Sequence, residues 1–220
     1  MFKNREDAAL QLARRLKARR LNKPLVLAIP RGGVVVGAVL ARELDAELDV
    51  VLARKLRAPC QAELAIGAVS EDGDVYLNAL AKQVPGFSEG YLDLERDHQL
   101  AEIRMRRWMY REVRPETHVS GRSVIVADDG VATGSTMLAA LRVLNTRTPH
   151  EVIVAVPVAA PETIAQLSGQ CHHVECLLAP ADFGSVGAFY RDFEQVDDDE
   201  VVRLLREHWT VRSRSKANVP

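Results

Sequence analysis

The sequence predicts an α/β fold with a doubly wound, mostly parallel central sheet. Short apolar runs rich in valine, isoleucine and leucine alternate along the chain with segments of helical periodicity. Parallel neighbours in a sheet need crossover connections, usually helices, so this alternation favours a parallel sheet. The chain has 220 residues, of which 47% are hydrophobic. Its size and composition suit one domain over residues 1–212, followed by a polar tail at 213–220.

Two helices and two strands are expected in the first quarter of the chain. Asn4 resembles the cap of a helix that reaches about Arg19. A first strand is expected at residues 24–29, where Pro30 and the two glycines after Arg31 end the apolar run. A buried helix at 34–44 and a second strand at 48–52 follow.

The middle of the chain predicts a small hood or helical insertion. Residues 64–69 and 74–77 flank the turn-forming residues 70–73, which is typical of a hairpin. A long polar helix is expected at 88–112, because apolar residues recur there at helical spacing: Leu94, Ala101, Met105 and Trp108. We expect the insertion to span about residues 60–118, with a contribution from 180–210.

The remaining elements continue the alternation. Strands are expected at 124–127, 152–156 and 174–178, and helices at 135–144, from Pro161 onward, and after the acidic run 197–200. The polar end of the chain, residues 212–220, is expected to be disordered.

Charge and composition exclude several classes of partner. The formal net charge is −1, with 29 basic and 30 acidic residues, so no global attraction to nucleic acid or anionic membrane is expected. The first residues are charged and amphipathic, unlike a signal peptide, and no apolar run approaches the roughly 20 residues of a membrane span. Three cysteines without CxxC spacing indicate reduced thiols. A cytoplasmic protein is therefore expected.

The strongest functional signal is an acidic loop after the strand at 124–127. Asp128 and Asp129 follow this buried strand, and small or hydroxyl residues then open a helix: Gly130, Ala132, Thr133, Gly134, Ser135 and Thr136. A helix N-terminus with free N–H groups favours phosphate, and the carboxylates suit ribose hydroxyls or hydrated Mg²⁺. A turn and helix cap without a ligand is the structural alternative. No Walker motif or G-x-G-x-x-G motif is present.

This run resembles the signature of type I phosphoribosyltransferases, which bind 5-phosphoribosyl-1-pyrophosphate (PRPP). The resemblance covers about residues 24–180 and implies the type I phosphoribosyltransferase fold. It implies that Asp128 and Asp129 hold the ribose hydroxyls and Mg²⁺, directly or through water, while residues 130 and 132–136 bind the ribose 5′-phosphate. Two positions depart from the usual pattern: Gly130 replaces an apolar residue, and Ala132 replaces a threonine.

A second loop supports this resemblance. Arg31, Gly32 and Gly33 follow the first strand and should reach the same sheet edge as the acidic loop. The resemblance implies that they bind pyrophosphate, with a non-proline cis peptide at Pro30–Arg31. Arg54 and Lys55 resemble a basic pair that meets pyrophosphate, although a solvated basic turn explains them equally well. Glu63 and residues 67–73 occupy the place of the family's mobile catalytic loop.

Aromatic residues suggest where an acceptor ring could bind. Phe183, Phe189, Tyr190 and Phe193 cluster after the last strand of a chain with only 5% aromatic residues. Phe183 or Tyr190 could stack on a base, and packing of the C-terminal helix is the alternative. The pairs Cys171–Cys176 and His172–His173 lack the spacing of a zinc site. The basic stretch at 104–111 favours a solvated or dimer-forming helix face over a nucleic-acid contact.

The resemblance implies Mg²⁺-dependent transfer of the phosphoribosyl group from PRPP to a nitrogen of a nucleobase or related heterocycle, with release of pyrophosphate. Catalysis is then assigned to Asp128, Asp129, Arg31 and Lys55, through positioning and charge. Expected partners are PRPP, a small nitrogenous acceptor and a second copy of the chain in a homodimer. A non-catalytic PRPP sensor is the alternative.

Overall fold

The central sheet of the protein is five-stranded and wholly parallel. The computed structural model describes residues 1–79 and 81–217. Strands β1 (Leu25–Ala28), β2 (Glu47–Val50), β6 (Ser123–Ala127), β7 (Glu151–Val158) and β8 (His173–Leu178) take the order β2-β1-β6-β7-β8. The predicted doubly wound α/β fold is confirmed. The strand order makes β1 and β6 direct neighbours, with Ala28 opposite Ala127, so the loops that follow them meet at one edge.

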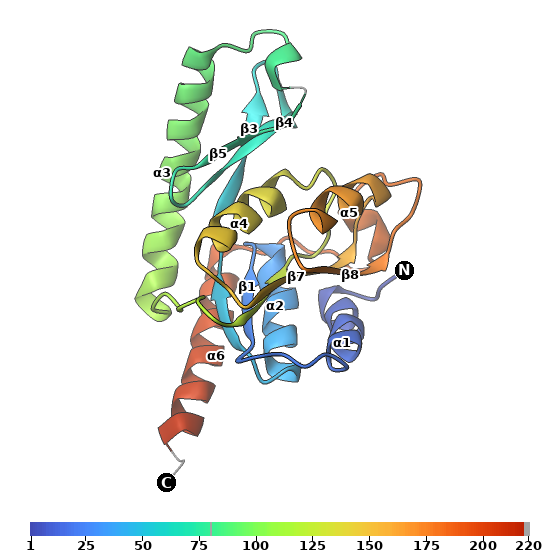
Figure 1. Ribbon diagram of the computed structural model, residues 1–220, viewed down its shortest axis with the longest axis vertical. Helices are drawn as coiled ribbons and strands as arrows, with labels where there is room; N and C mark the ends of the chain where they lie inside the picture. Colours follow the sequence, from blue (N-terminus) through green and yellow to red (C-terminus); the bar gives the residue numbers. More distant parts are fainter. Residues whose placement is uncertain (80, 218–220) are drawn as a thin grey trace.

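Helices cover both faces of this sheet (Figure 1). Helices α1 (Arg5–Leu16), α2 (Gly32–Glu43) and α6 (Asp198–Ala217) pack on one face, and α4 (Ser135–Thr146) and α5 (Pro161–Ser168) on the other. Side chains alternate along a strand, and each sheet face therefore has its own apolar core. Val26 and Ile125 lie in one core, and Val124 and Val154 lie in the other. The long valine-rich runs of the sequence are buried on both faces for this reason.

A hood stands above the carboxyl edge of the sheet (Figure 1). It consists of the antiparallel sheet β3 (Ala53–Ala58), β4 (Gln61–Ser70) and β5 (Val75–Leu77), the turn η1 (Ala81–Gln83) and the long helix α3 (Glu89–Val113). The predicted hairpin and helix are present. Strand β3 was not predicted, because Arg54, Lys55 and Arg57 hide the strand pattern in a basic run. Arg54 and Lys55 are therefore strand residues, not turn residues.

Helix α3 is held to β3 by polar side chains. Buried Glu95 accepts hydrogen bonds from the backbone N–H and the Nε of Arg57, at 3.1 and 2.8 Å, and Gln99 accepts from Arg54 Nε at 2.6 Å. The apolar residues that the periodicity singled out lie on the opposite, solvent-exposed face. The buried face of α3 is thus partly polar, which single-sequence periodicity does not reveal.

A buried ionic cluster joins the hood to the central sheet. Arg111 of α3 donates to Asp49 of β2 at 2.6 Å, and Arg147, which follows α4, lies 3.5 Å from Glu71 in the β4–β5 turn. Glu71 Oε2 and Arg111 Nε are buried without a partner among the described residues. Burial raises the pKa of Glu71 to about 7, although Arg147 opposes the shift.

The segment after β8 differs from its predicted place. Residues 180–210 do not lie in the hood as a whole: the turn η2 (Val186–Phe189) packs near Phe2 and Tyr190, whereas α6 reaches the hood helix α3. Helix α6 packs on α2, β2 and α3. It continues through Ala217, so residues 212–217 are helical rather than disordered as predicted, and residues 218–220 lie outside the described part. No helix within residues 1–79 and 81–217 combines the length and apolarity needed to cross a membrane.

Candidate functional site

Two loops meet where β1 and β6 end. The loop after β1 carries the cis peptide Pro30–Arg31, as expected, and opens α2. Its glycines touch the acidic loop: a Cβ on Gly32 would collide with Asp129 Oδ2, and one on Gly33 would lie 2.8 Å from the carbonyl oxygen of Ala127. Any side chain at either position would displace the acidic loop, so the glycines serve this close approach.

Hydrogen bonds within the protein hold the acidic pair in place. Asp128 Oδ1 accepts a hydrogen bond from the backbone N–H of Asp129 at 2.8 Å. Asp129 Oδ2 accepts from Arg5 Nε at 2.7 Å, and the backbone carbonyl of Asp129 accepts from the Tyr190 hydroxyl at 2.5 Å. Arg5 was not predicted as a site residue, because an arginine in the first turn of an amphipathic helix carries no motif signal.

Burial raises the pKa of both carboxyl groups. The pKa of Asp128 is raised well above its ordinary value, first by burial and then by the charge of Asp129. Burial also raises the pKa of Asp129, although the hydrogen bond and charge of Arg5 oppose this shift. Two close, partly desolvated carboxylates favour a ligand that brings hydroxyl donors or a cation.

The loop from Ala132 to Thr136 directs free backbone N–H groups to the sheet edge at the start of α4. Among the described residues, none of its five backbone N–H groups has a hydrogen-bond acceptor. Gly134 takes the left-handed conformation, with φ of 74°, directly before α4. Thr163 Oγ1 donates to the Ala132 carbonyl at 2.6 Å and anchors the loop to α5. Free N–H groups and the positive end of the α4 dipole make this loop suited to phosphate.

The side chain of Val186 lies against Gly130. A Cβ on Gly130 would lie 2.5 Å from Cγ1 of Val186 and 2.9 Å from Cγ1 of Val158. The side chain of Val186, from η2, thus occupies the space that an apolar residue at position 130 would fill. The glycine allows the C-terminal segment to pack on the acidic loop.

Three arginines gather beside the loop that follows β1. Arg31 and Arg106 both face the carboxylate of Asp198, at 4.0 and 3.2 Å. Burial lowers the pKa of Arg54, and the charges of Arg106 and Arg31 add to this effect. Asp198 and Glu102, which lies 3.8 Å from Arg54, offset two of the three guanidinium charges. The cationic cluster of Arg31, Arg54 and Arg106 thus keeps one net positive charge, which suits an anion.

The structure separates Arg54 from Lys55. Arg54 faces α3, whereas Lys55 is the next residue of β3 and points to the opposite face, which packs through Ala53 on Ala139 of α4.

Arg106 is the member of the cationic cluster that sequence reasoning missed, because it lies in a helix with many surface arginines. Residues 67–70, expected in a mobile loop, belong to β4, and the side chain of Glu63 lies outside the described part.

The site offers few protein ligands for a metal ion. No group of three or more histidine, cysteine, aspartate or glutamate side chains suited to a metal occurs in residues 1–79 and 81–217. Asp129 Oδ2 is already bonded to Arg5, while no protein donor in the described structure faces Asp128 Oδ2. One or two carboxylates fit Mg²⁺, which usually keeps several waters and binds substrate phosphates. The acidic pair therefore fits a hydrated Mg²⁺ carried with a phosphate ligand.

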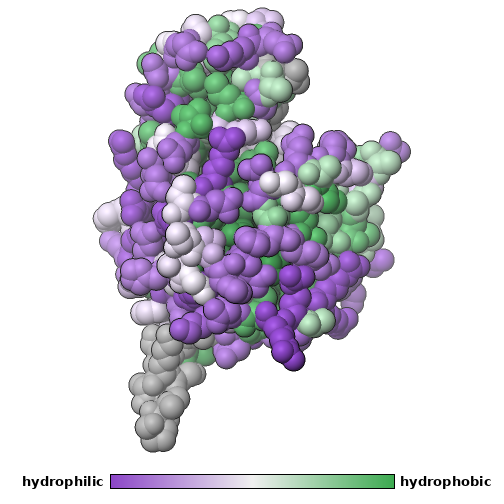
Figure 2. Space-filling model, in the orientation of Figure 1, coloured by the Kyte–Doolittle hydropathy of each residue, from purple (hydrophilic) through white to green (hydrophobic). Residues whose placement is uncertain are grey.

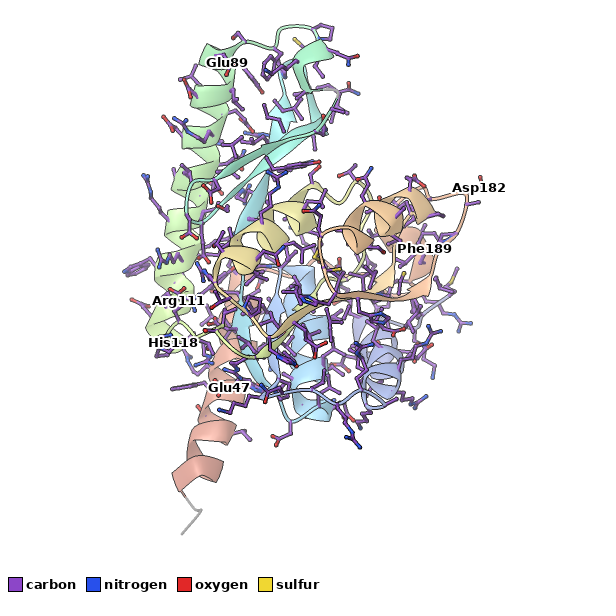
Figure 3. All side chains as sticks on the ribbon, in the orientation of Figure 1. Glu47, Glu89, Arg111, His118, Asp182 and Phe189 are labelled. Atoms are coloured by element: carbon purple, nitrogen blue, oxygen red, sulfur yellow. The ribbon has the colours of Figure 1, made fainter. Side chains whose placement is uncertain are left out.

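The aromatic cluster divides into two pairs with different surroundings. Tyr190 is only 5% exposed and packs on Phe2 and Phe193, with ring centroids 5.3 and 5.0 Å away. Its burial leaves little surface for a base. Phe183 is half-buried and pairs with Phe189 at 5.4 Å. Figure 3 labels Asp182 and Phe189, which mark this pair on the side of the molecule near α5, and Figure 2 shows hydrophobic surface on that side.

Comparison with known proteins points to one family. The sequence model of the family described as "Phosphoribosyl transferase domain" matches residues 3–193. A protein from Mycobacterium tuberculosis, named provisionally as a phosphoribosyl transferase, is 40% identical over 205 residues, which are 93% of this chain and 46% of that protein. The chain thus spans about half the length of this curated relative.

Two further relatives extend the comparison. Uracil phosphoribosyltransferase of Acinetobacter baylyi is 28% identical over 142 residues, which are 64% of this chain and 65% of that protein. A Thermus thermophilus protein of known crystal structure is 45% identical, with a TM-score of 0.80 over 94% of this chain and 98% of that one. That similarity places the central sheet and the hood in one shared fold.

Proposed function

Since the chain belongs to the phosphoribosyl transferase domain family, we propose that it transfers the 5-phosphoribosyl group of PRPP to a nitrogen of a nucleobase or related heterocycle. Pyrophosphate is the second product. The observation that carries the proposal is the meeting of two glycine-containing loops around Asp128 and Asp129 at the ends of β1 and β6. PRPP has a phosphate at one end and a pyrophosphate at the other, and the two loops suit these two ends.

Each part of PRPP has a proposed binding place. The backbone N–H groups of residues 132–136 bind the 5′-phosphate, aided by the α4 dipole. Asp128 and Asp129 accept hydrogen bonds from the ribose hydroxyls. Gly32, Gly33 and the arginines 31, 54 and 106 bind pyrophosphate; Lys55 remains a proposed pyrophosphate ligand from the other face of β3.

The proposed chemistry depends on charge rather than on a side-chain nucleophile. The bond between ribose C1 and the pyrophosphate oxygen breaks with its electron pair going to pyrophosphate. The acceptor nitrogen forms the new bond to C1 and releases its proton to solvent. Positive charge develops on the ribose ring, where the carboxylates of Asp128 and Asp129 stabilise it. The arginine cluster stabilises the negative charge of the departing pyrophosphate. Mg²⁺, when bound, would neutralise pyrophosphate charge and would be held by Asp128 with Asp129 nearby.

The acceptor is proposed to bind next to Phe183. This side chain follows β8 at the sheet edge that carries the acidic loop, and its half-exposed ring could stack on a flat heterocycle. Relatives named as uracil phosphoribosyltransferases support a nucleobase as the acceptor class. We also propose the cytoplasmic location predicted from the sequence. The three cysteines are free thiols in the structure, which suits a reducing compartment.

The experiment is a pyrophosphate-release assay with PRPP and Mg²⁺ across a panel of purine and pyrimidine bases. The proposal predicts release that depends on one class of base and that stops when Mg²⁺ is chelated. Tight PRPP binding with no release for any base would instead identify a non-catalytic PRPP sensor. Absence of PRPP binding would contradict both functions.

A further inference from the structure

Asp198 lies where two arginines of the proposed pyrophosphate site converge. It is the first residue of α6, and its carboxylate contacts both the loop that follows β1 and the hood helix α3. Oδ1 accepts a hydrogen bond from Arg106 Nε at 3.2 Å, and Oδ2 lies 4.0 Å from Arg31 NH1. A negative charge thus lies beside the groups that are proposed to bind a negative ligand.

The carboxylate of Asp198 is fixed by its surroundings. The hydroxyl of Tyr110, whose side chain is fully buried, donates a second hydrogen bond to Oδ1. Burial, and then the hydrogen bond to Asp198, raise the pKa of Tyr110, so this hydroxyl keeps its proton and stays a donor. The start of α6 also favours a negative charge, because a helix N-terminus carries partial positive charge. Asp198 is therefore a stationary negative charge.

Asp198 uses only part of the hydrogen-bonding capacity of the two arginines. Its bond to Arg106 is made through Nε, and the terminal nitrogens of Arg106 have no acceptor among the residues that the structure describes. Arg31 NH1 is beyond hydrogen-bond distance from Asp198 and interacts with it through charge alone. Pyrophosphate can therefore bind both arginines while Asp198 keeps its place, and the carboxylate then repels the bound anion.

Asp198 has two opposing effects on the affinity for an anion. As a hydrogen-bond acceptor it orients Arg106, which reduces the entropy that this side chain loses on binding. As a charge it repels the anion, and its side chain is only 25% exposed, so water and salt screen the repulsion incompletely. The repulsion is the larger effect, because pyrophosphate carries several negative charges whereas a single bond orients Arg106.

We propose that Asp198 is a positioning residue that lowers the affinity of the site for pyrophosphate. It orients Arg106 toward the anion and at the same time offsets part of the positive charge of Arg31 and Arg106. Pyrophosphate therefore leaves more readily after the transfer. The inference rests on the proposed function, because it takes pyrophosphate as the departing product.

Replacement by asparagine separates charge from orientation. The amide oxygen in Asp198→Asn still accepts from Arg106 and Tyr110, but the negative charge is gone. Titration calorimetry with inorganic pyrophosphate and Mg²⁺ should show about tenfold tighter binding than by the wild type. Asp198→Ala loses the orientation as well and should gain less. Asp199→Asn removes the same charge at the next, exposed position of α6, and this matched control should stay within about twofold of the wild type.

Salt distinguishes the charge effect from a structural one. The advantage of Asp198→Asn over the wild type should shrink from about tenfold in about 50 mM KCl to about threefold or less in about 500 mM KCl, because ions screen the repulsion. If the wild type binds pyrophosphate and Asp198→Asn binds it no more tightly, or if the advantage is independent of salt, the inference is wrong and the proposed transfer stands. Absence of pyrophosphate binding by both proteins would also overturn the inference, and a parallel titration with PRPP would show whether the proposed function fails with it.

Discussion

Arg5 Nε lies 2.7 Å from Asp129 Oδ2 and joins the start of α1 to the acidic loop. The guanidinium is itself fixed: its carbon lies 3.8 Å from the ring centroid of Phe193, and NH1 donates to the Glu194 carbonyl at 2.7 Å. The N-terminal helix and the segment before α6 therefore converge on one of the two carboxylates assigned to ribose. Asp129 is oriented by residues that lie far from it in the sequence.

Replacement of Arg5 should weaken PRPP binding in a pH-dependent way. Arg5 lowers the pKa of Asp129 against the effect of burial, so Arg5→Gln should raise that pKa further. A protonated Asp129 accepts hydrogen bonds poorly. Titration calorimetry should show a loss of PRPP affinity of about tenfold at pH 8 and a larger loss at pH 6. Arg5→Lys should retain most of the affinity.

Arg14→Gln, at an exposed position of α1, serves as the control for this prediction. If Arg5→Gln binds PRPP with the pH dependence of the wild type, the assigned role of Arg5 is wrong.

Gly130 and Val186 should act as a pair. Gly130→Ala places a methyl group 2.5 Å from Val186 Cγ1 and should lower the free energy of unfolding by about 1 to 3 kcal/mol through overpacking. Val186→Ala in the same chain makes room for that methyl group and should recover part of the loss. Urea unfolding of the two single variants and the double variant measures the coupling. Strictly additive effects would show that η2 does not pack against the acidic loop in solution.

Most residues of the candidate site lie in short sequence motifs and could be predicted from them. The acidic loop could be predicted because a strand, two aspartates and a glycine-containing helix start lie within 13 consecutive residues, 124–136. The loop at 30–33 could be placed beside it because consecutive elements alternate regularly. In the structure, these two loops follow the neighbouring strands β6 and β1.

Long-range partners could not be predicted in the same way. Arg5 and Arg106 reach the site from helices whose sequences contain several other arginines, so nothing local distinguishes them. Strand β3 was missed because its two faces contact α3 and α4, and two of its basic residues, Arg54 and Arg57, are paired with polar groups on α3. Tertiary contacts, and not local propensity, determine that such a segment forms a strand.

Phe183 should affect the acceptor more than PRPP. Phe183→Ala removes the half-exposed ring that is proposed to stack on the base and should raise the acceptor Michaelis constant about tenfold, with little change in that of PRPP. Phe183→Leu retains apolar packing against Phe189 and separates stacking from packing. A loss of thermal stability with unchanged acceptor kinetics would assign the ring to packing alone.

Glu71 should make stability depend on pH near neutrality. Its pKa in the folded protein is about 7, above the ordinary value of 4.5, so the folded state holds this proton more tightly than the unfolded state. The stabilisation is complete below the ordinary pKa and is lost as pH rises through about 7. Between pH 5 and pH 8 the free energy of unfolding of the wild type should fall on the order of 2 kcal/mol more than that of Glu71→Gln.

Urea unfolding at several pH values measures this difference. Asp72→Asn is the control, because Asp72 contacts the same Arg147 at 3.2 Å but is half exposed. Parallel pH profiles for the wild type and Glu71→Gln would refute the assignment.

The central claim is that Asp128 and Asp129 hold the ribose of PRPP, and titration calorimetry with PRPP and Mg²⁺ tests it most directly. The wild type should bind PRPP, and Asp128→Asn and Asp129→Asn should each bind about tenfold more weakly or worse, since each loses a charged hydrogen bond of about 1.5 to 3 kcal/mol. Circular dichroism should show that both variants remain folded. Wild-type PRPP affinity in both folded variants, or no PRPP binding by the wild type, would contradict the account.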